Sequence, residues 1–159
     1  MTTEVFPHEF EGGVSAHNKK FAIVVSKFNK TVTQKLLDGA LQCFKKNGAL
    51  DVDVFRCPGA YELPQVASFI TLQKKYDAVV CLGAVIRGET PHFDFICQEC
   101  ARGIGAVSYE RNIPVLFGVV TTNTFEQAME RAGGSVGNKG YDTALGAIEM
   151  ADLFSKIVR

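Results

Sequence analysis

Four short apolar runs alternate along the chain with longer stretches in which apolar residues recur at every third or fourth position. The runs are rich in β-branched residues and predict buried strands, whereas the longer stretches predict amphipathic helices. The expected strands cover residues 21–26, 52–57, 78–82 and 114–120. The expected helices cover residues 31–47, 62–76, 92–111 and 142–158, with a short helix capped by Asn123 or Thr124 and ended by Gly133.

This alternation indicates a parallel sheet, because parallel strands need long crossover connections that are usually helical. We expect a three-layer α/β/α sandwich, with a four-stranded parallel sheet of flavodoxin-like winding and helices on both faces. Residues 1–159 are expected to form a single domain, in which residues 1–20 are an extended lead-in. Ligands of such folds bind at the carboxyl ends of the strands, so the residues that follow each strand are the candidates.

The composition excludes several classes of function. Lys plus Arg and Asp plus Glu number 17 each, so the bulk charge favours neither nucleic acid nor an anionic membrane as a partner. The apolar runs are of strand length and too short to span a bilayer. Residues 1–20 are polar and include acidic side chains, unlike a secretory signal or a transit peptide, and we expect a cytoplasmic location.

The five cysteines are an odd number scattered through apolar segments, which indicates reduced thiols in a core rather than a disulfide framework. Cys97 and Cys100 match the C-x-x-C pattern of redox and zinc sites. They fall within an expected helix, and no second pair of cysteines or histidines is spaced to complete a metal shell. We therefore expect no metal here.

The segment from Gly83 to His92 contains the largest number of candidate binding and catalytic groups. Its glycines allow main-chain amides to approach a ligand, and Thr90 and Pro91 suit the N-cap and first residue of the following helix. A helix N-terminus favours an anion, and an imidazole such as that of His92 gains and loses a proton near neutral pH. The alternative is an ordinary strand-to-helix connection with a surface histidine.

Four motifs lie at strand ends or shortly after them. They are P-G-A-Y-E-L-P at 58–64, G-A-V-I-R-G-E-T-P-H-F at 83–93, F-G-V-V-T-T at 117–122, and E-Q-A-M-E-R-A-G with G-N-K-G at 126–140. Each could arise by chance, but in this order and at these spacings the chain resembles the lumazine synthase family between about residues 21 and 151. The resemblance implies a transferase of riboflavin biosynthesis that needs no cofactor. Such an enzyme condenses 5-amino-6-(D-ribitylamino)uracil with 3,4-dihydroxy-2-butanone 4-phosphate to 6,7-dimethyl-8-ribityllumazine, phosphate and water.

The resemblance assigns the pyrimidine and its ribityl chain to three segments. Phe28 would stack on the pyrimidine, and its polar neighbours argue against the alternative of a core phenylalanine. Glu62, with the backbone of Ala60 and Tyr61, would bind ribityl hydroxyls, although a carboxylate there also suits a helix N-terminus. The backbone of residues 84–86 (Ala84, Val85 and Ile86) would bind the pyrimidine edge, where composition alone suggests only a continued strand. Asn29 is a secondary candidate.

The resemblance also assigns the phosphate and the proton transfers. The amides of Glu89 and Thr90, the Thr90 hydroxyl and the Arg131 guanidinium would hold the phosphate, with Lys139 secondary. Glu89 stands where the family usually has a small residue, so we expect its side chain to face solvent. His92 would be the catalytic acid and base. Arg87 is interpreted as a structural support of the loop.

The family's assembly is implied in the same way. Phe117 and Arg131 match positions that reach the pocket of a neighbouring subunit, so a homopentamer is expected. The segment 133–140 lacks the insertion of members that stop at pentamers, which favours an icosahedral shell of 60 subunits. Riboflavin synthase is a further candidate partner.

Three other functions are alternatives for this chain. A flavodoxin-type flavin-binding module needs a glycine-containing phosphate loop after the first strand, and residues 27–34 contain no glycine. A phosphoacceptor signalling domain needs acidic residues at strand ends, where this chain has Ser26, Lys27 and Phe28. A non-enzymatic flavin-binding or shell-forming scaffold that kept the family's fold stays open as the alternative.

Overall fold

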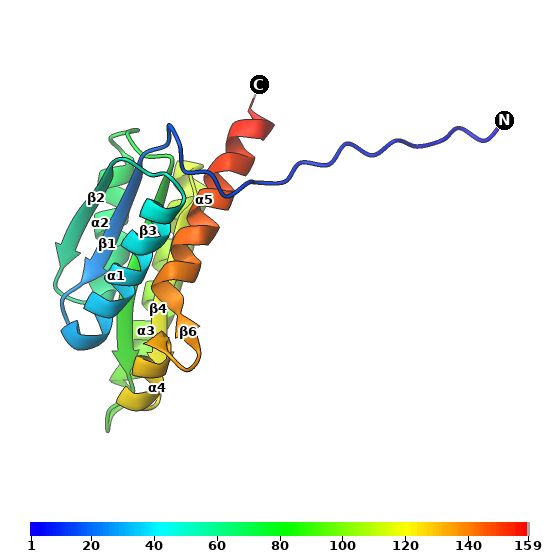
Figure 1. The fold of residues 1–159 in the computed structure, drawn as a ribbon. Coiled ribbons are helices and arrows are strands. Elements are labelled where there is room, and N and C mark those ends of the chain that lie inside the picture. The colour runs from blue at the N-terminus through cyan, green and yellow to red at the C-terminus, as the bar shows by residue number, and fades with distance from the viewer. Residues whose placement is uncertain (159) are drawn as a thin grey trace.

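A four-stranded parallel sheet forms the centre of the protein, seen here in a computed structural model that describes residues 1–158 (Figure 1). Its strands are β1 (Phe21–Ser26), β2 (Val52–Cys57), β3 (Ala78–Ile86) and β4 (Val115–Thr122). They lie in the order β2-β1-β3-β4, and every neighbouring pair is parallel. The expected parallel sheet and its winding are confirmed.

Helices cover both faces of the sheet. The helices are α1 (Lys30–Lys46), α2 (Leu63–Thr71), α3 (His92–Arg111), α4 (Phe125–Glu130) and α5 (Lys139–Ile157). One buried cluster joins α1, α4 and α5 to alternate residues of β1, such as Ile23, and the other joins α2 and α3 to the residues between, such as Val24. Because successive side chains of a strand point to opposite faces, each fully buried strand contributes to both clusters. The three-layer sandwich is confirmed.

The helices α1 and α5 approach each other closely at Gly140. A Cβ atom added there would overlap the main-chain oxygen of Leu36 in α1. The missing side chain therefore lets the first turn of α5 rest directly against the backbone of α1. This contact anchors α5 where it follows the small hairpin of β5 (Ala132–Gly134) and β6 (Gly137–Asn138).

The third strand is longer than the sequence pattern indicates. The expected strand ended at Leu82 before Gly83, but β3 continues to Ile86, paired with β4 as far as Thr122. Gly83 does not break the strand because it is packed within it: an added Cβ would lie 3.1 Å from Leu63 Cδ1. The glycine therefore allows close packing rather than a turn.

Several helix boundaries also differ. The second helix ends at Thr71 rather than near residue 76, and Lys74 adopts a positive φ of 51° that a helix does not continue through. The last helix begins at Lys139 rather than near residue 142, because the Asn138 side chain caps it by accepting from the Tyr141 N–H. The expected cap of α4 is confirmed, with Thr124 and Gln127 forming a capping box.

Residues 1–20 contain no helix or strand, and their first part extends away from the sandwich (Figure 1). The later part is attached to α5. The Gly13 N–H donates to Asp152 Oδ2 at 2.6 Å, and Lys156 Nζ donates to the Glu11 carbonyl at 2.7 Å. Within residues 1–158, no helix has the length and apolar character needed to cross a membrane.

Candidate active site

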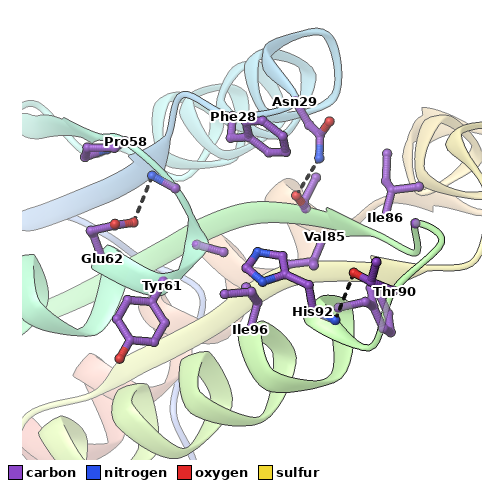
Figure 2. A pocket seen from close by; sticks show the side chains of 15 residues that line it. Phe28, Asn29, Pro58, Tyr61, Glu62, Val85, Ile86, Thr90, His92 and Ile96 are labelled. Atoms are coloured by element: carbon purple, nitrogen blue, oxygen red, sulfur yellow. Dashed lines mark hydrogen bonds between the residues drawn. The ribbon is translucent and has the colours of Figure 1, made fainter.

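A cavity of about 770 Å³ opens at the carboxyl ends of β1, β2 and β3 and at the start of α3 (Figure 2). This is the edge of a parallel sheet at which ligands are expected to bind. It is lined by Phe28, Asn29, Pro58, Gly59, Ala60, Tyr61, Glu62, Ala84, Val85, Ile86, Gly88, Thr90, His92, Phe93 and Ile96. Ten of the fourteen predicted site residues are therefore brought together around one cavity of a single chain.

The turn after β1 presents an aromatic ring at the mouth of the cavity. Phe28 is 71% exposed although it is a large apolar side chain, so the ring is available to a planar ligand. Its N–H donates to the Pro58 carbonyl at 3.0 Å, which holds the turn against the end of β2. Asn29 adopts the left-handed conformation, with φ of 59° and ψ of 48°, and its side-chain amide donates to the Ala84 carbonyl at 2.9 Å.

The segment after β2 presents a carboxylate. A short 3-10 helix, η1 (Ala60–Glu62), follows Gly59, and Glu62 Oε2 accepts a hydrogen bond from the Gly59 N–H at 3.1 Å. This bond fixes the orientation of the carboxylate and leaves Oε1 available for a ligand hydroxyl. Ala60 is buried, whereas the Tyr61 side chain is 56% exposed and lies at the edge of the labelled group (Figure 2).

The end of β3 presents main-chain groups. The pairing of β3 with β1 stops at Leu82, whereas its pairing with β4 continues to Ile86, so beyond Leu82 one edge of β3 has no strand beside it. The Ala84 carbonyl points to that edge, because it accepts the hydrogen bond from Asn29. Backbone groups two residues apart in a strand point the same way, so the peptide groups of Ile86 face the cavity too. Those of Val85 face β4 instead, and this residue contributes its side chain.

The loop after β3 leads directly into α3. Gly88 and Thr90 line the cavity, and the Thr90 hydroxyl accepts from the His92 N–H at a long 3.4 Å. The expected cap is displaced by one residue: Pro91, with ψ of 3°, is the N-cap, and His92 is the first helical residue. Its ring projects from the start of α3 into the middle of the labelled residues (Figure 2). The start of α3 and an imidazole therefore share one cavity.

Four predicted residues do not line the cavity of the single chain: Glu89, Phe117, Arg131 and Lys139. Glu89 is exposed, in keeping with the expectation that its carboxylate faces solvent. Phe117 lies on β4 and is 39% exposed. Arg131 follows α4 as its C-cap and donates to the Gln127 carbonyl at 3.0 Å, whereas Lys139 begins α5.

Five lining residues were not predicted as site residues: Pro58, Gly59, Gly88, Phe93 and Ile96. The first three belong to the motifs that suggested the site. Ile96 could have been found from helical geometry, since residues four apart share one face of a helix and Ile96 is four residues after His92. Phe93 is the last residue of the motif at 83–93, but helical geometry gave no reason to place it beside His92, because neighbouring helical residues point in different directions.

The cysteines near the cavity are not poised as nucleophiles. Cys57 ends β2 beneath Gly59, and burial raises the pKa of its thiol to about 11. Burial likewise raises the pKa of Cys100 to about 12, with a contribution from nearby Cys97. Thiols with such values stay protonated near neutral pH. Within residues 1–158, no group of three or more His, Cys, Asp or Glu side chains is arranged to hold a metal ion.

Comparison with known proteins gives a consistent result. Residues 18–155 match the family model of 6,7-dimethyl-8-ribityllumazine synthase. The protein of that name from Desulfotalea psychrophila is 55% identical over 149 residues, covering 92% of this chain and 96% of the relative. Those from Chlorobium phaeovibrioides and Clostridium kluyveri are 52% and 51% identical, with coverage of 92% and 93% of this chain and 96% and 97% of theirs. With this match over nearly its whole length, and with the family's motifs around one cavity, the chain belongs to the 6,7-dimethyl-8-ribityllumazine synthase family.

Proposed function

We propose that the protein condenses 5-amino-6-(D-ribitylamino)uracil with 3,4-dihydroxy-2-butanone 4-phosphate, and that it does so in the cavity at the strand ends. The observation that carries the proposal is the gathering of an exposed ring, a carboxylate, main-chain groups and an imidazole around one space. Each suits a different part of the two substrates. The cytoplasmic location expected from the sequence is part of the same proposal.

The pyrimidine substrate has a flat ring and a chain of hydroxyls. In this proposal Phe28 stacks on the ring, and the peptide groups at Ala84 and Ile86 bind its polar edge. Glu62 Oε1 accepts a ribityl hydroxyl, since Oε2 is already bonded to the Gly59 N–H. Stacking supplies area, and the hydrogen bonds supply orientation.

The second substrate brings a phosphate. The N–H groups of Gly88, Glu89 and Thr90 in the loop, and that of Phe93 at the start of α3, offer donors at the positive end of the helix macrodipole. The Thr90 hydroxyl adds another polar group at this place. A phosphate held there places the four-carbon chain beside the pyrimidine amines.

The chemistry then consists of proton transfers around two condensations. An amine of the pyrimidine attacks the ketone and a first water leaves, phosphate is then eliminated, and the second amine attacks the remaining carbonyl and closes the ring as a second water leaves. His92 projects into the cavity and is placed to donate and accept these protons, which typically contributes on the order of 10²–10⁴-fold. Holding both substrates together supplies much of the remaining rate enhancement.

Phe117 and Arg131 enter the proposal through a neighbouring subunit. Neither lines the cavity of its own chain, so both can serve a site only if a second copy brings them there. We propose that the protein assembles as a homopentamer and that twelve pentamers form a shell of 60 subunits. Riboflavin synthase is a candidate partner of that assembly.

Formation of the fluorescent lumazine from both substrates tests the reaction. We expect His92→Ala to lower kcat by about 10² to 10⁴-fold without abolishing turnover. His17→Ala is the matched control, because His17 is exposed and lies outside the cavity. A wild-type rate no faster than the uncatalysed background would leave the scaffold alternative standing.

Mixed assemblies test the shared site. His92→Ala and Arg131→Met would each impair activity alone. After the two variants are unfolded, mixed and refolded, some interfaces pair an intact His92 from one subunit with an intact Arg131 from its neighbour. We therefore expect activity to return in the mixture. Sedimentation gives the size of the assembly directly, and a monomeric active species would contradict the proposal of a shared site.

A further inference from the structure

The side chain of Arg87 joins three segments around the loop 88–91 without lining the cavity. Its main-chain N–H donates to the Thr122 carbonyl at 2.9 Å. Arg87 is the residue after Ile86, which forms the last β3–β4 pair with Thr122. Its Nε donates to Asn123 Oδ1 at 3.1 Å, and a terminal nitrogen donates to Asp94 Oδ1 at 3.3 Å. The guanidinium therefore connects the end of β3, the residue after β4 and the first turn of α3.

The same guanidinium packs on an aromatic ring of the cavity wall. Its Cζ lies 4.3 Å from the centroid of the Phe93 ring, within the range of a cation–π contact. Phe93 lines the cavity and directly follows His92. The planar guanidinium stacks on the Phe93 ring and donates hydrogen bonds in its own plane, so it restricts the orientation of both the ring and the hydrogen-bond acceptors. A lysine ammonium group has no such plane and would restrict them less.

The ion pair also has an electrostatic effect. Asp94 stands in the first turn of α3, so its negative charge lies at the helix end proposed to receive the phosphate. An unpaired carboxylate there would repel an anion. The positive charge of Arg87 offsets it, and the two side chains are only about half exposed, at 44% and 49%.

We propose that Arg87 is a positioning residue for the phosphate-bearing substrate, acting by bracing the loop 88–91 and by neutralising Asp94. It acts through Phe93, Asp94 and Asn123 and does not touch the substrate. The inference rests on the proposed function, because it names a residue that tunes one subsite of that reaction.

Arg87→Met removes the stack, the hydrogen bonds and the charge while keeping an unbranched side chain. We expect KM for the phosphate-bearing substrate to rise about tenfold, and the Kd of inorganic phosphate, measured by calorimetry, to rise in parallel. We expect kcat and KM for the pyrimidine to change by less than about threefold. Lys75→Met is the matched control, since Lys75 also pairs with an aspartate, Asp53, and lies over a tyrosine ring at the far end of the sheet.

Two further variants separate the contributions of Arg87. Arg87→Met combined with Asp94→Asn should recover part of the lost phosphate affinity, because the repelling charge has gone. Arg87→Lys should fall between wild type and Arg87→Met, since it keeps the charge but not the planar stack. Thermal unfolding checks that each variant is folded.

The results distinguish this inference from the function on which it rests. Failure of the wild-type protein to form lumazine would overturn the proposed function itself. An active wild type together with unchanged phosphate affinity in Arg87→Met would overturn the role of Arg87 alone. Equal losses for both substrates would also overturn it, because they would indicate general damage to the site.

Discussion

The side-chain amide of Asn29 donates a hydrogen bond to the main-chain oxygen of Ala84 at 2.9 Å, and this bond ties the turn after β1 to the end of β3 (Figure 2). Ala84 lies beyond Leu82, in the part of β3 that is not paired with β1. The proposed stacking ring, Phe28, is the preceding residue, so the bond sets the position of that ring relative to the free edge of β3. One hydrogen bond thus relates two parts of the proposed pyrimidine site.

Replacing Asn29 tests this relationship. Asn29→Ala removes the bond and places a less suitable residue at φ of 59°, and we expect a loss of about 1–2 kcal/mol in the free energy of unfolding. KM for the pyrimidine should rise as well. Asn29→Gly is the control, since glycine tolerates this backbone but cannot donate: it should lose substrate affinity with a smaller loss of stability. Denaturant unfolding and steady-state kinetics measure both effects, and unaltered kinetics in both variants would contradict the relationship.

The contact between α1 and α5 can be tested with two glycines of the same helix. Gly140→Ala places a methyl group against the Leu36 carbonyl, and we expect a loss of about 1–3 kcal/mol or more, because the backbones must separate. At Gly146 an added Cβ would lie 3.7 Å from Leu116 Cδ1, an ordinary contact. Gly146→Ala should therefore be neutral or stabilising by up to about 1 kcal/mol through helix propensity. Urea unfolding of the two variants checks this, and equal effects would refute the packing argument.

The attachment of the N-terminal segment to α5 should depend on pH. The Gly13 N–H, Lys156 and Lys19 hold the pKa of Asp152 well below its usual range. A carboxyl group with a lowered folded pKa contributes stability above its unfolded pKa of about 3.9, and this contribution falls as the pH drops toward the folded value.

Asp152→Asn should accordingly be less stable than wild type above about pH 5, and the difference should shrink below about pH 4. Urea unfolding at a series of pH values measures it. Glu149→Gln, an exposed acid one turn earlier in α5, serves as the control. A difference that stays constant from pH 7 to pH 3 would show that ionisation of Asp152 is not responsible.

The thiols should react in a fixed order. Burial raises the pKa of Cys57 to about 11 and that of Cys100 to about 12, so few thiolates are present at neutral pH. Cys97 is the only one of the five that is not buried. With iodoacetamide at pH 7.5 we expect slow labelling that begins at Cys97, and labelling of all five cysteines after unfolding. Peptide mass spectrometry identifies the sites, and fast labelling of native Cys57 would contradict this order.

Much of the fold follows from local patterns along the chain. The alternation of apolar runs with helical periodicity predicts the parallel sheet, and β1 and α3 have the expected bounds. The boundaries that differ depend on contacts that no local pattern reports. A glycine after an apolar run usually marks the end of a strand. Gly83 lies inside β3 instead, because Leu63 and Ser26 pack against it.

The site shows the same division. Phe28, Glu62, Thr90 and His92 follow three different strands, and the rule that ligands bind at the carboxyl ends of a parallel sheet was enough to expect them together. Arg87 was expected to support the loop, and its hydrogen bonds to Asn123 and Asp94 agree with that role. These partners and the contact with Phe93 were not predicted, because Asn123 lies 36 residues away in the sequence.

The sequence by itself determined the alternation of the four sheet strands with helices, the loops that meet at one edge of the sheet, and the family, because these depend on residue type and spacing. The tertiary structure decided where β3 ends, which of its peptide groups remain unpaired, and which side chains line the cavity. Those features depend on distances between segments far apart in the sequence. Packing sets such distances, and no local periodicity encodes them.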